Sequence, residues 1–134
     1  MNRRLAMGLM LAALLASIAH AQPAIDPQAE VRYLLASVET SGCEFFRNDQ
    51  WYDSKAAETH LSEKYQYLSA IGLIDTTEDF IEKVATRSSF TGQPYEVRCH
   101  GGPTMTGSQW LRDELARFRT HRRPASQSEG RPPQ

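Results

Sequence analysis

The chain has few of the features that mark a membrane protein, a metalloprotein or an enzyme. After residue 21 it has no apolar run near the roughly 20 residues that cross a bilayer. Its two cysteines are isolated, without the Cys-x-x-Cys or His-x-x-x-His spacing of zinc sites. It has no Gly-x-Ser-x-Gly elbow and no ordered triad. We therefore expect no cofactor and no metal, and the signal for an enzyme is weak.

The chain also lacks an excess of positive charge. It has 15 Lys and Arg residues against 16 Asp and Glu residues, and five arginines lie at or after Arg117. The body before them is acidic, whereas a nucleic-acid-binding module needs a basic face. A nucleic-acid partner is therefore not expected. The basic end is more typical of a solvated, solubilising segment than of contact with an anionic lipid or polymer.

The first 21 residues have the pattern of a cleaved export signal. Arg3 and Arg4 form a basic start, Leu5 to Ala19 is almost wholly apolar or small, and Ala19-His20-Ala21 is a small-x-small cleavage pattern. The apolar run is too short for a retained membrane anchor. We expect cleavage after Ala21, which removes two arginines and changes the net charge from −1 to −3. The predicted location is the periplasm, with no transmembrane span left in the mature protein.

The rest of the chain is predicted to form one domain and a tail. Residues 22–121 are the domain, and residues 122–134 are a disordered basic, proline-rich tail without large apolar side chains. In an oxidising compartment, Cys43 and Cys99 favour a disulfide, which would stabilise so small a domain by roughly 4 kcal/mol. The alternatives are a catalytic thiol, or a metal site that uses Cys99 and His100.

Hydrophobic periodicity predicts an α+β fold. Four helices are expected: from Asp26 to Gly42, from Asp53 or Ser54 to about Ala70, from Thr76 to about Arg87, and from about Ser108 onward. A hairpin over Cys43–Tyr52 turns at Asn48-Asp49, and Tyr95–Cys99 has the alternation of a third strand. The prediction is four helices with a small three-stranded antiparallel sheet, stapled by one disulfide.

Several short phrases occur together in this order: Ser41-Gly42-Cys43, Arg47-Asn48, Trp51-Tyr52, Ala57 to Tyr65, Glu78 to Glu82, Ser88-Ser89, Gly92 to Tyr95 and Trp110-Leu111. In this respect the chain resembles the YfeK-like family of small exported bacterial proteins, a domain of unknown function. The resemblance covers nearly all of the predicted domain. It implies a single periplasmic domain without a cofactor, and it implies no particular activity.

The loop over residues 87–95 is the surface that most favours binding. Polar, glycine-containing loops on a rigid scaffold often carry binding residues. The alternative is a helix end and turn whose hydroxyl groups satisfy only the loop itself. The candidate binding residues, in this loop and predicted to lie near it, are Arg47, Tyr52, Arg87, Ser88, Ser89, Thr91, Gly92, Tyr95 and Arg98.

Two functions follow from these observations. The leading hypothesis is a non-catalytic binding or envelope-associated module, whose partner is an envelope protein or a cell-wall component. The alternative is a small hydrolase that acts on cell-wall material through His60 or His100 and a nearby carboxylate, which requires the two groups to converge in one cleft. The acidic residues Glu58, Glu63, Asp79 and Glu82 are spaced as solvated helix faces, not as a glycosidase pair.

Overall fold

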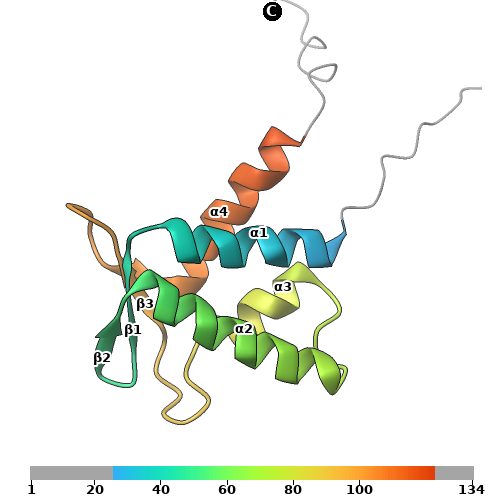
Figure 1. Cartoon of the computed structure of the whole chain (residues 1–134), viewed down its shortest axis with the longest axis horizontal. Coiled ribbons are helices and arrows are strands. Elements are labelled where there is room, and N and C mark those ends of the chain that lie inside the picture. Colours follow the sequence, from blue (N-terminus) through green and yellow to red (C-terminus); the bar gives the residue numbers. More distant parts are fainter. Residues whose placement is uncertain (1–25, 123–134) are drawn as a thin grey trace, which may run out of the picture.

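The computed structural model describes residues 26–122, so the predicted signal peptide, and the predicted tail after Arg122, lie outside the described residues. The elements, shown in Figure 1, are α1 (Pro27–Thr40), β1 (Glu44–Arg47), β2 (Gln50–Tyr52), α2 (Ser54–Ala70), α3 (Thr77–Asp79), the π-helical η1 (Phe80–Val84), β3 (Glu96–Arg98), β4 (Met105–Thr106) and α4 (Gly107–His121). The predicted α+β class is confirmed. Within residues 26–122, no helix combines the length and apolarity that crossing a membrane requires.

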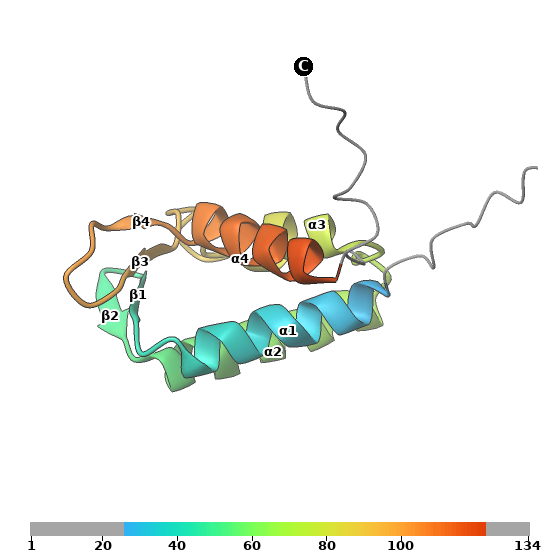
Figure 2. The same cartoon turned by 90° about the horizontal axis from the view of Figure 1, so that it is seen from above.

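The helices form two layers that are closed at one end by the sheet. Figure 2 shows two layers, α1 with α2 in one and α4 with α3 in the other, with the strands at one end of both; α4 contacts the π-helix η1 that follows α3. The core between the layers contains side chains with no exposed surface, among them Leu34, Val38, Phe80, Val84 and Val97. One apolar core thus joins every helix to the sheet.

The sheet is antiparallel, with the strand order β2-β1-β3-β4. Asn48 and Asp49, with φ angles of 49° and 64°, form the two-residue turn between β1 and β2, the geometry that matches the twist of a hairpin. The prediction of three strands was wrong by one. Strand β4 contains only Met105 and Thr106, too few residues to show an alternating pattern in the sequence.

Local side chains fix where the helices begin. Asp26 accepts a hydrogen bond from the Gln28 amide, Asp53 accepts one from Ala56, and Thr76 forms a capping box with Asp79. The expected third helix is different from the prediction, because one α-helical turn continues as a π-helix. The Ala85 amide donates to the Phe80 carbonyl (3.3 Å), five residues back as in a π-helix, and also to the Ile81 carbonyl (3.2 Å), which in addition accepts the Thr86 hydroxyl (2.8 Å).

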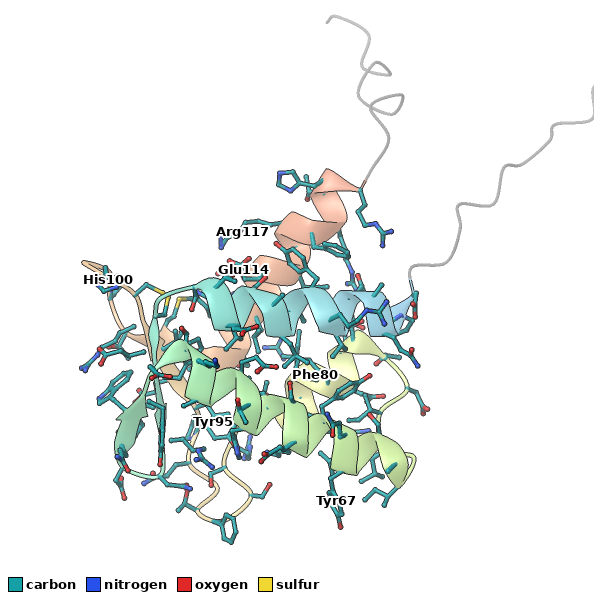
Figure 3. All side chains as sticks on the ribbon, viewed as in Figure 1. Tyr67, Phe80, Tyr95, His100, Glu114 and Arg117 are labelled. Carbon is teal, nitrogen blue, oxygen red and sulfur yellow. A yellow bond between two sulfur atoms is a disulfide. The ribbon has the colours of Figure 1, made fainter. Side chains whose placement is uncertain are left out.

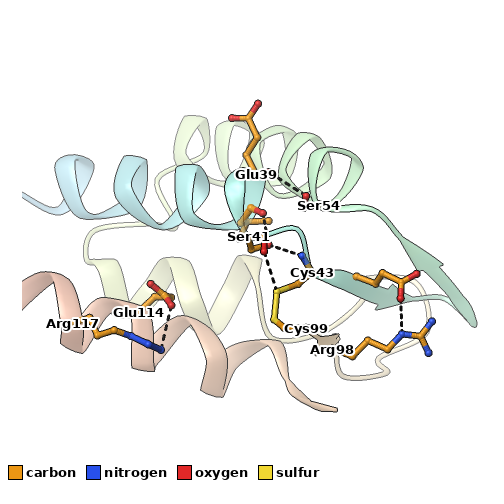
Figure 4. The surroundings of a disulfide bond; sticks show 10 residues. Glu39, Ser41, Cys43, Ser54, Arg98, Cys99, Glu114 and Arg117 are labelled. Atoms are coloured by element: carbon orange, nitrogen blue, oxygen red, sulfur yellow. Dashed lines mark hydrogen bonds and ion pairs between the residues drawn. A yellow bond between two sulfur atoms is a disulfide. The ribbon is translucent and has the colours of Figure 1, made fainter. Parts of the chain in front are cut away.

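The predicted disulfide joins Cys43 to Cys99, 56 residues apart, and rules out the free thiol and the cysteine-based metal site (Figure 4). It crosses from the residue before β1 to the residue after β3. The neighbouring pair in the ladder is Glu44 with Arg98, so the sheet register itself brings the two cysteines opposite each other.

A buried ion pair connects α1 to α4 at the other end of the molecule. The Glu30 carboxylate is 2% exposed and accepts two hydrogen bonds from Arg119, at 2.7 and 2.8 Å. The Thr77 hydroxyl donates a third at 2.7 Å, and Arg119 also pairs with Glu78. The sequence predicted a solvated basic end, which is wrong for Arg119: this side chain is structural.

Candidate functional site

The two faces of the sheet separate the predicted binding residues. Alternate residues of a strand point to opposite faces, and directly paired residues share a face. Phe45 pairs with Tyr52 and Val97, which places Arg47, Tyr52 and Tyr95 on the face toward the helices. Arg98 belongs to the opposite, outer face, where it pairs with Glu44 at 2.8 Å and lies 3.9 Å from the Trp51 ring centre. Arg98 is therefore not part of the same site.

Arg47 joins the hairpin to α2. It is the last residue of β1, and its guanidinium lies 4.8 Å from the centre of the Tyr52 ring. Its Nη1 lies 3.0 Å from Nδ1 of His60, in the second turn of α2. The Asp53 cap sets where α2 begins, and so which face of the helix turns His60 toward the strand.

Tyr95 is held from both sides of its backbone, close to α2 (Figure 3). Its amide donates to the Thr86 carbonyl at 3.0 Å, and its carbonyl accepts the Gly107 amide at 2.8 Å. The side chain is 7% exposed, with its hydroxyl oxygen 3.0 Å from Nε2 of His60. Lys64, one turn after His60, lies 3.4 Å from the same oxygen and donates to the Arg87 carbonyl at 2.9 Å.

The hydrogen-bond partners determine the tautomer of His60. A guanidinium only donates, so Nδ1 must accept from Arg47, and Nε2 must carry the proton that it donates to Tyr95. Burial, with the charges of Arg47 and Lys64, lowers the pKa of His60 from 6.5 to about 4. Burial and the Arg47 charge also lower the pKa of Lys64, whereas burial raises the pKa of the Tyr95 hydroxyl. His60 is therefore neutral at pH 7.

The groups that this site offers to a ligand are mainly hydrogen-bond donors. The Tyr95 oxygen accepts from His60 and lies within reach of Lys64, and its own proton has no acceptor among the described residues. No carboxylate of residues 26–122 lies within 4.0 Å of Arg47 or Lys64. In the same part of the chain, no three His, Cys, Asp or Glu side chains converge on a point. The arrangement fits an anion, because Arg47 and the Tyr95 hydroxyl keep protons to donate and the formal charges are positive.

A small apolar cavity of about 30 Å³ adjoins these donors. Its buried walls come from the sheet, α2, the residue after η1, and α4: Phe45, Ala57, Leu61, Ala85 and Leu111. The partly exposed side chains of Arg47, Tyr52 and His60 also line it, and so does Tyr95. The site thus combines an anion-binding edge with a narrow apolar interior, the usual composition of a small-ligand pocket.

The profile of the Family of unknown function (DUF5329) matches residues 25–119, well over half of the chain. The chain belongs to this family. Comparisons with curated proteins and with solved structures found no match. The matched residues include the whole disulfide and every side chain of the site, so the site lies within the DUF5329 domain.

Two of the four hydroxyl groups of residues 87–95, those of Ser88 and Thr91, hold this loop of the DUF5329 domain in place. Ser88 is 3% exposed, and its hydroxyl accepts the amides of Phe90 (3.2 Å) and Thr91 (3.4 Å). The Thr91 hydroxyl donates to Asn48 in the hairpin turn at 3.2 Å. Gly92 has a φ of 71°, which suits glycine. The Ser88 hydroxyl is thus satisfied within its own turn, and the Thr91 hydroxyl joins the loop to the hairpin.

The remaining predicted binding residues lie partly outside the pocket and partly in it. Ser89 and Arg87 have exposed side chains, and Arg87 contributes its carbonyl to Lys64. Of the predicted set, only Arg47, Tyr52 and Tyr95 converge on the pocket of the DUF5329 domain. Lys64 was missed as a site residue, although its position four residues after His60 placed both on one helix face.

The hydrolase hypothesis requires a histidine and a carboxylate in one cleft, and among residues 26–122 no carboxylate lines the pocket at His60. Both ring nitrogens of His60 are occupied, by Arg47 and Tyr95. His100 is exposed in the turn after β3. The acidic residues serve elsewhere in the described part of this DUF5329 domain: Glu58 accepts from Ser62, Asp79 closes the capping box, Glu82 pairs with Arg112, and Glu63 is exposed. No His–carboxylate pair therefore forms at this pocket.

Proposed function

We propose that this protein is a non-catalytic binding module that holds an anionic group of an envelope protein or a cell-wall component. The binding site is the pocket bounded by Arg47, Tyr52, His60, Lys64 and Tyr95, named here the Arg47 pocket. The observation that carries the proposal is the state of its two cations. Arg47 and Lys64 are partly buried and have no carboxylate partner among residues 26–122, whereas Arg119, which is also partly buried, has two.

The energetics favour an external anion. Shielding a cation from water is costly unless an opposite charge compensates it, and residues that are exposed do not bear this cost. A ligand carboxylate or phosphate that enters the Arg47 pocket would supply the compensating charge. It would also accept the Tyr95 proton, which has no acceptor among the described residues.

The proposed location is the periplasm. The export pattern that ends at Ala21 supports it, and so does the disulfide, because such bonds persist in oxidising compartments. The resemblance to the YfeK-like family remains a prediction within the broader family, and it supports the same location. The partner classes, an envelope protein or the cell wall, follow from this location.

The test is a cross-linked pull-down in which wild type, Arg47→Ala and Arg98→Ala serve as baits. Each is incubated separately with a periplasmic extract and with purified cell-wall fragments. Arg98→Ala is the matched control, because Arg98 also lies on this sheet and against an aromatic ring, on the outer face. We expect retention by wild type and Arg98→Ala, and loss from Arg47→Ala with an unchanged circular dichroism spectrum. Equal retention by all three proteins would refute the assignment of the Arg47 pocket.

A further inference from the structure

We propose that the Arg47 pocket binds a small aliphatic carboxylate, the chemistry of a peptide C-terminus whose last side chain is no larger than that of alanine. This inference rests on the proposed function and names the ligand class of the same site. Three features of the described residues carry it: the donor arrangement, the number of charges and the size of the cavity.

The donor arrangement selects a group with two acceptor oxygens. Arg47 and Tyr95 bind the two nitrogens of one imidazole ring, so His60 fixes their relative position. Arg47 uses only Nη1 for this contact and keeps other N–H groups for a ligand. Both carboxylate oxygens would accept from the N–H groups that Arg47 keeps free, since a planar carboxylate matches a guanidinium donor.

The number of charges favours a monoanion. Arg47 is a permanent cation, and His60 is neutral because its Nδ1 accepts a hydrogen bond. The Lys64 ammonium is already committed to the Arg87 carbonyl and lies beside the Tyr95 oxygen. Arg47 is therefore the cation that keeps N–H groups for a ligand, and a carboxylate with one negative charge matches this single guanidinium better than a phosphate with nearly two.

The cavity sets the size of the attached group. A volume of about 30 Å³ holds roughly two water-sized spheres, which is enough for a methyl group and too little for an aromatic ring. Its walls are apolar, among them Ala57, Leu61 and Leu111. The other side of the ligand faces the partly exposed Arg47 and Tyr52, so a peptide chain has a path from the carboxylate to solvent.

The experiment is a titration of the full chain, observed by the NMR signals of the His60 ring. The probes are N-acetyl-alanine, its uncharged amide, propionate, N-acetyl-phenylalanine and inorganic phosphate. We expect N-acetyl-alanine to shift the His60 signals with a Kd on the order of 1 mM, typical of so small a ligand. The amide should bind at least tenfold more weakly, because it loses the charge that pairs with Arg47, and N-acetyl-phenylalanine should be weaker because its ring does not fit.

The variants distinguish failure of this inference from failure of the proposed function. Arg47→Ala should weaken N-acetyl-alanine binding at least tenfold, and Arg98→Ala should leave it unchanged. If propionate binds as tightly as N-acetyl-alanine, the pocket is assigned to small free acids. If N-acetyl-alanine binds more tightly, the pocket is assigned to peptide C-termini. Both outcomes support the carboxylate inference. Equal binding of the amide, or a shift with phosphate alone, overturns the carboxylate inference and leaves an anion site or a neutral-ligand site. If no probe shifts the NMR signals of His60, and Arg47→Ala retains the partner as well as wild type does, both proposals are overturned.

Discussion

Removal of the Arg119 side chain should destabilise the domain far more than removal of its neighbour Arg117. In Arg119→Ala the Glu30 carboxylate, 2% exposed, keeps only the Thr77 hydroxyl of its three hydrogen bonds. Breaking a buried ion pair costs 3–5 kcal/mol, and the lower end applies here because the Arg119 side chain is 38% exposed. We expect a loss of about 3 kcal/mol, a large fraction of the stability of a small domain.

Urea unfolding measures this loss. With an m value near 1.5 kcal/mol/M, the midpoint of Arg119→Ala should fall by about 2 M. Arg117→Ala is the control, since its pair with Glu114 is largely exposed on the arginine side and should contribute less than about 1 kcal/mol. A double variant with methionine at both Glu30 and Arg119 should lose less than Arg119→Ala, because no buried charge is left unpaired. Equal midpoints for Arg119→Ala and Arg117→Ala would refute the reasoning.

The same pair makes a prediction about pH. The hydrogen bonds from Arg119, above all, hold the pKa of Glu30 below its ordinary value of 4.5 in the folded protein. The unfolded state therefore binds this proton more readily. The stabilisation is complete above about pH 4.5 and is lost as the pH falls through the lower folded pKa. The difference between wild type and Arg119→Ala should shrink in that acidic range.

Three further predictions concern other parts of the molecule. His60 has a folded pKa of about 4 beside Arg47, Lys64 and Tyr95, so acidification from pH 6.5 to 4 should cost about 1.5 kcal/mol after allowance for solvent screening, and His60→Gln should remove this slope in urea unfolding. The Cys43→Ser/Cys99→Ser double variant should lose roughly 4 kcal/mol, measured in the same way. Thr76→Ala should lose about 1 kcal/mol by opening the capping box at the start of α3, which thermal unfolding would detect.

Each of these predictions has a result that contradicts it. An unchanged acid slope in His60→Gln would assign the slope to other groups. If the Cys43→Ser/Cys99→Ser variant is as stable as wild type, the disulfide does not stabilise the domain by reducing the conformational entropy of the unfolded chain. A stable Thr76→Ala protein would mean that solvent replaces the capping hydrogen bonds at no net cost.

The sequence predicted local features well because a few neighbouring residues determine them. Asp26, Asp53 and Thr76 mark helix starts, and Asn48-Asp49 marks the hairpin turn. The features that failed depend on tertiary contacts. The π-helix η1 contacts α2 and α4 in the core, and β4 pairs with β3.

The site was only partly predictable for the same reason. Arg47 and Tyr95 were recognised as polar residues near a loop and a hairpin, but nothing local shows that they bind opposite nitrogens of His60. Likewise, Glu30 and Arg119 are 89 residues apart, so their pairing becomes visible only when α1 and α4 pack together. The packing of α2 against the sheet determines which of these side chains meet in the Arg47 pocket, and the sequence alone does not show this packing.

Strand β1 is fixed at both ends, which bears on the thermodynamics of ligand binding. The disulfide at Cys43 holds the residue before it, and the Arg47 contact with His60 holds its last residue. A ligand would therefore meet side chains that are already oriented, and little conformational entropy would be lost when it binds. Calorimetry should show a small entropic penalty for a rigid ligand, with most of the remaining penalty arising from the rotatable bonds of the ligand itself.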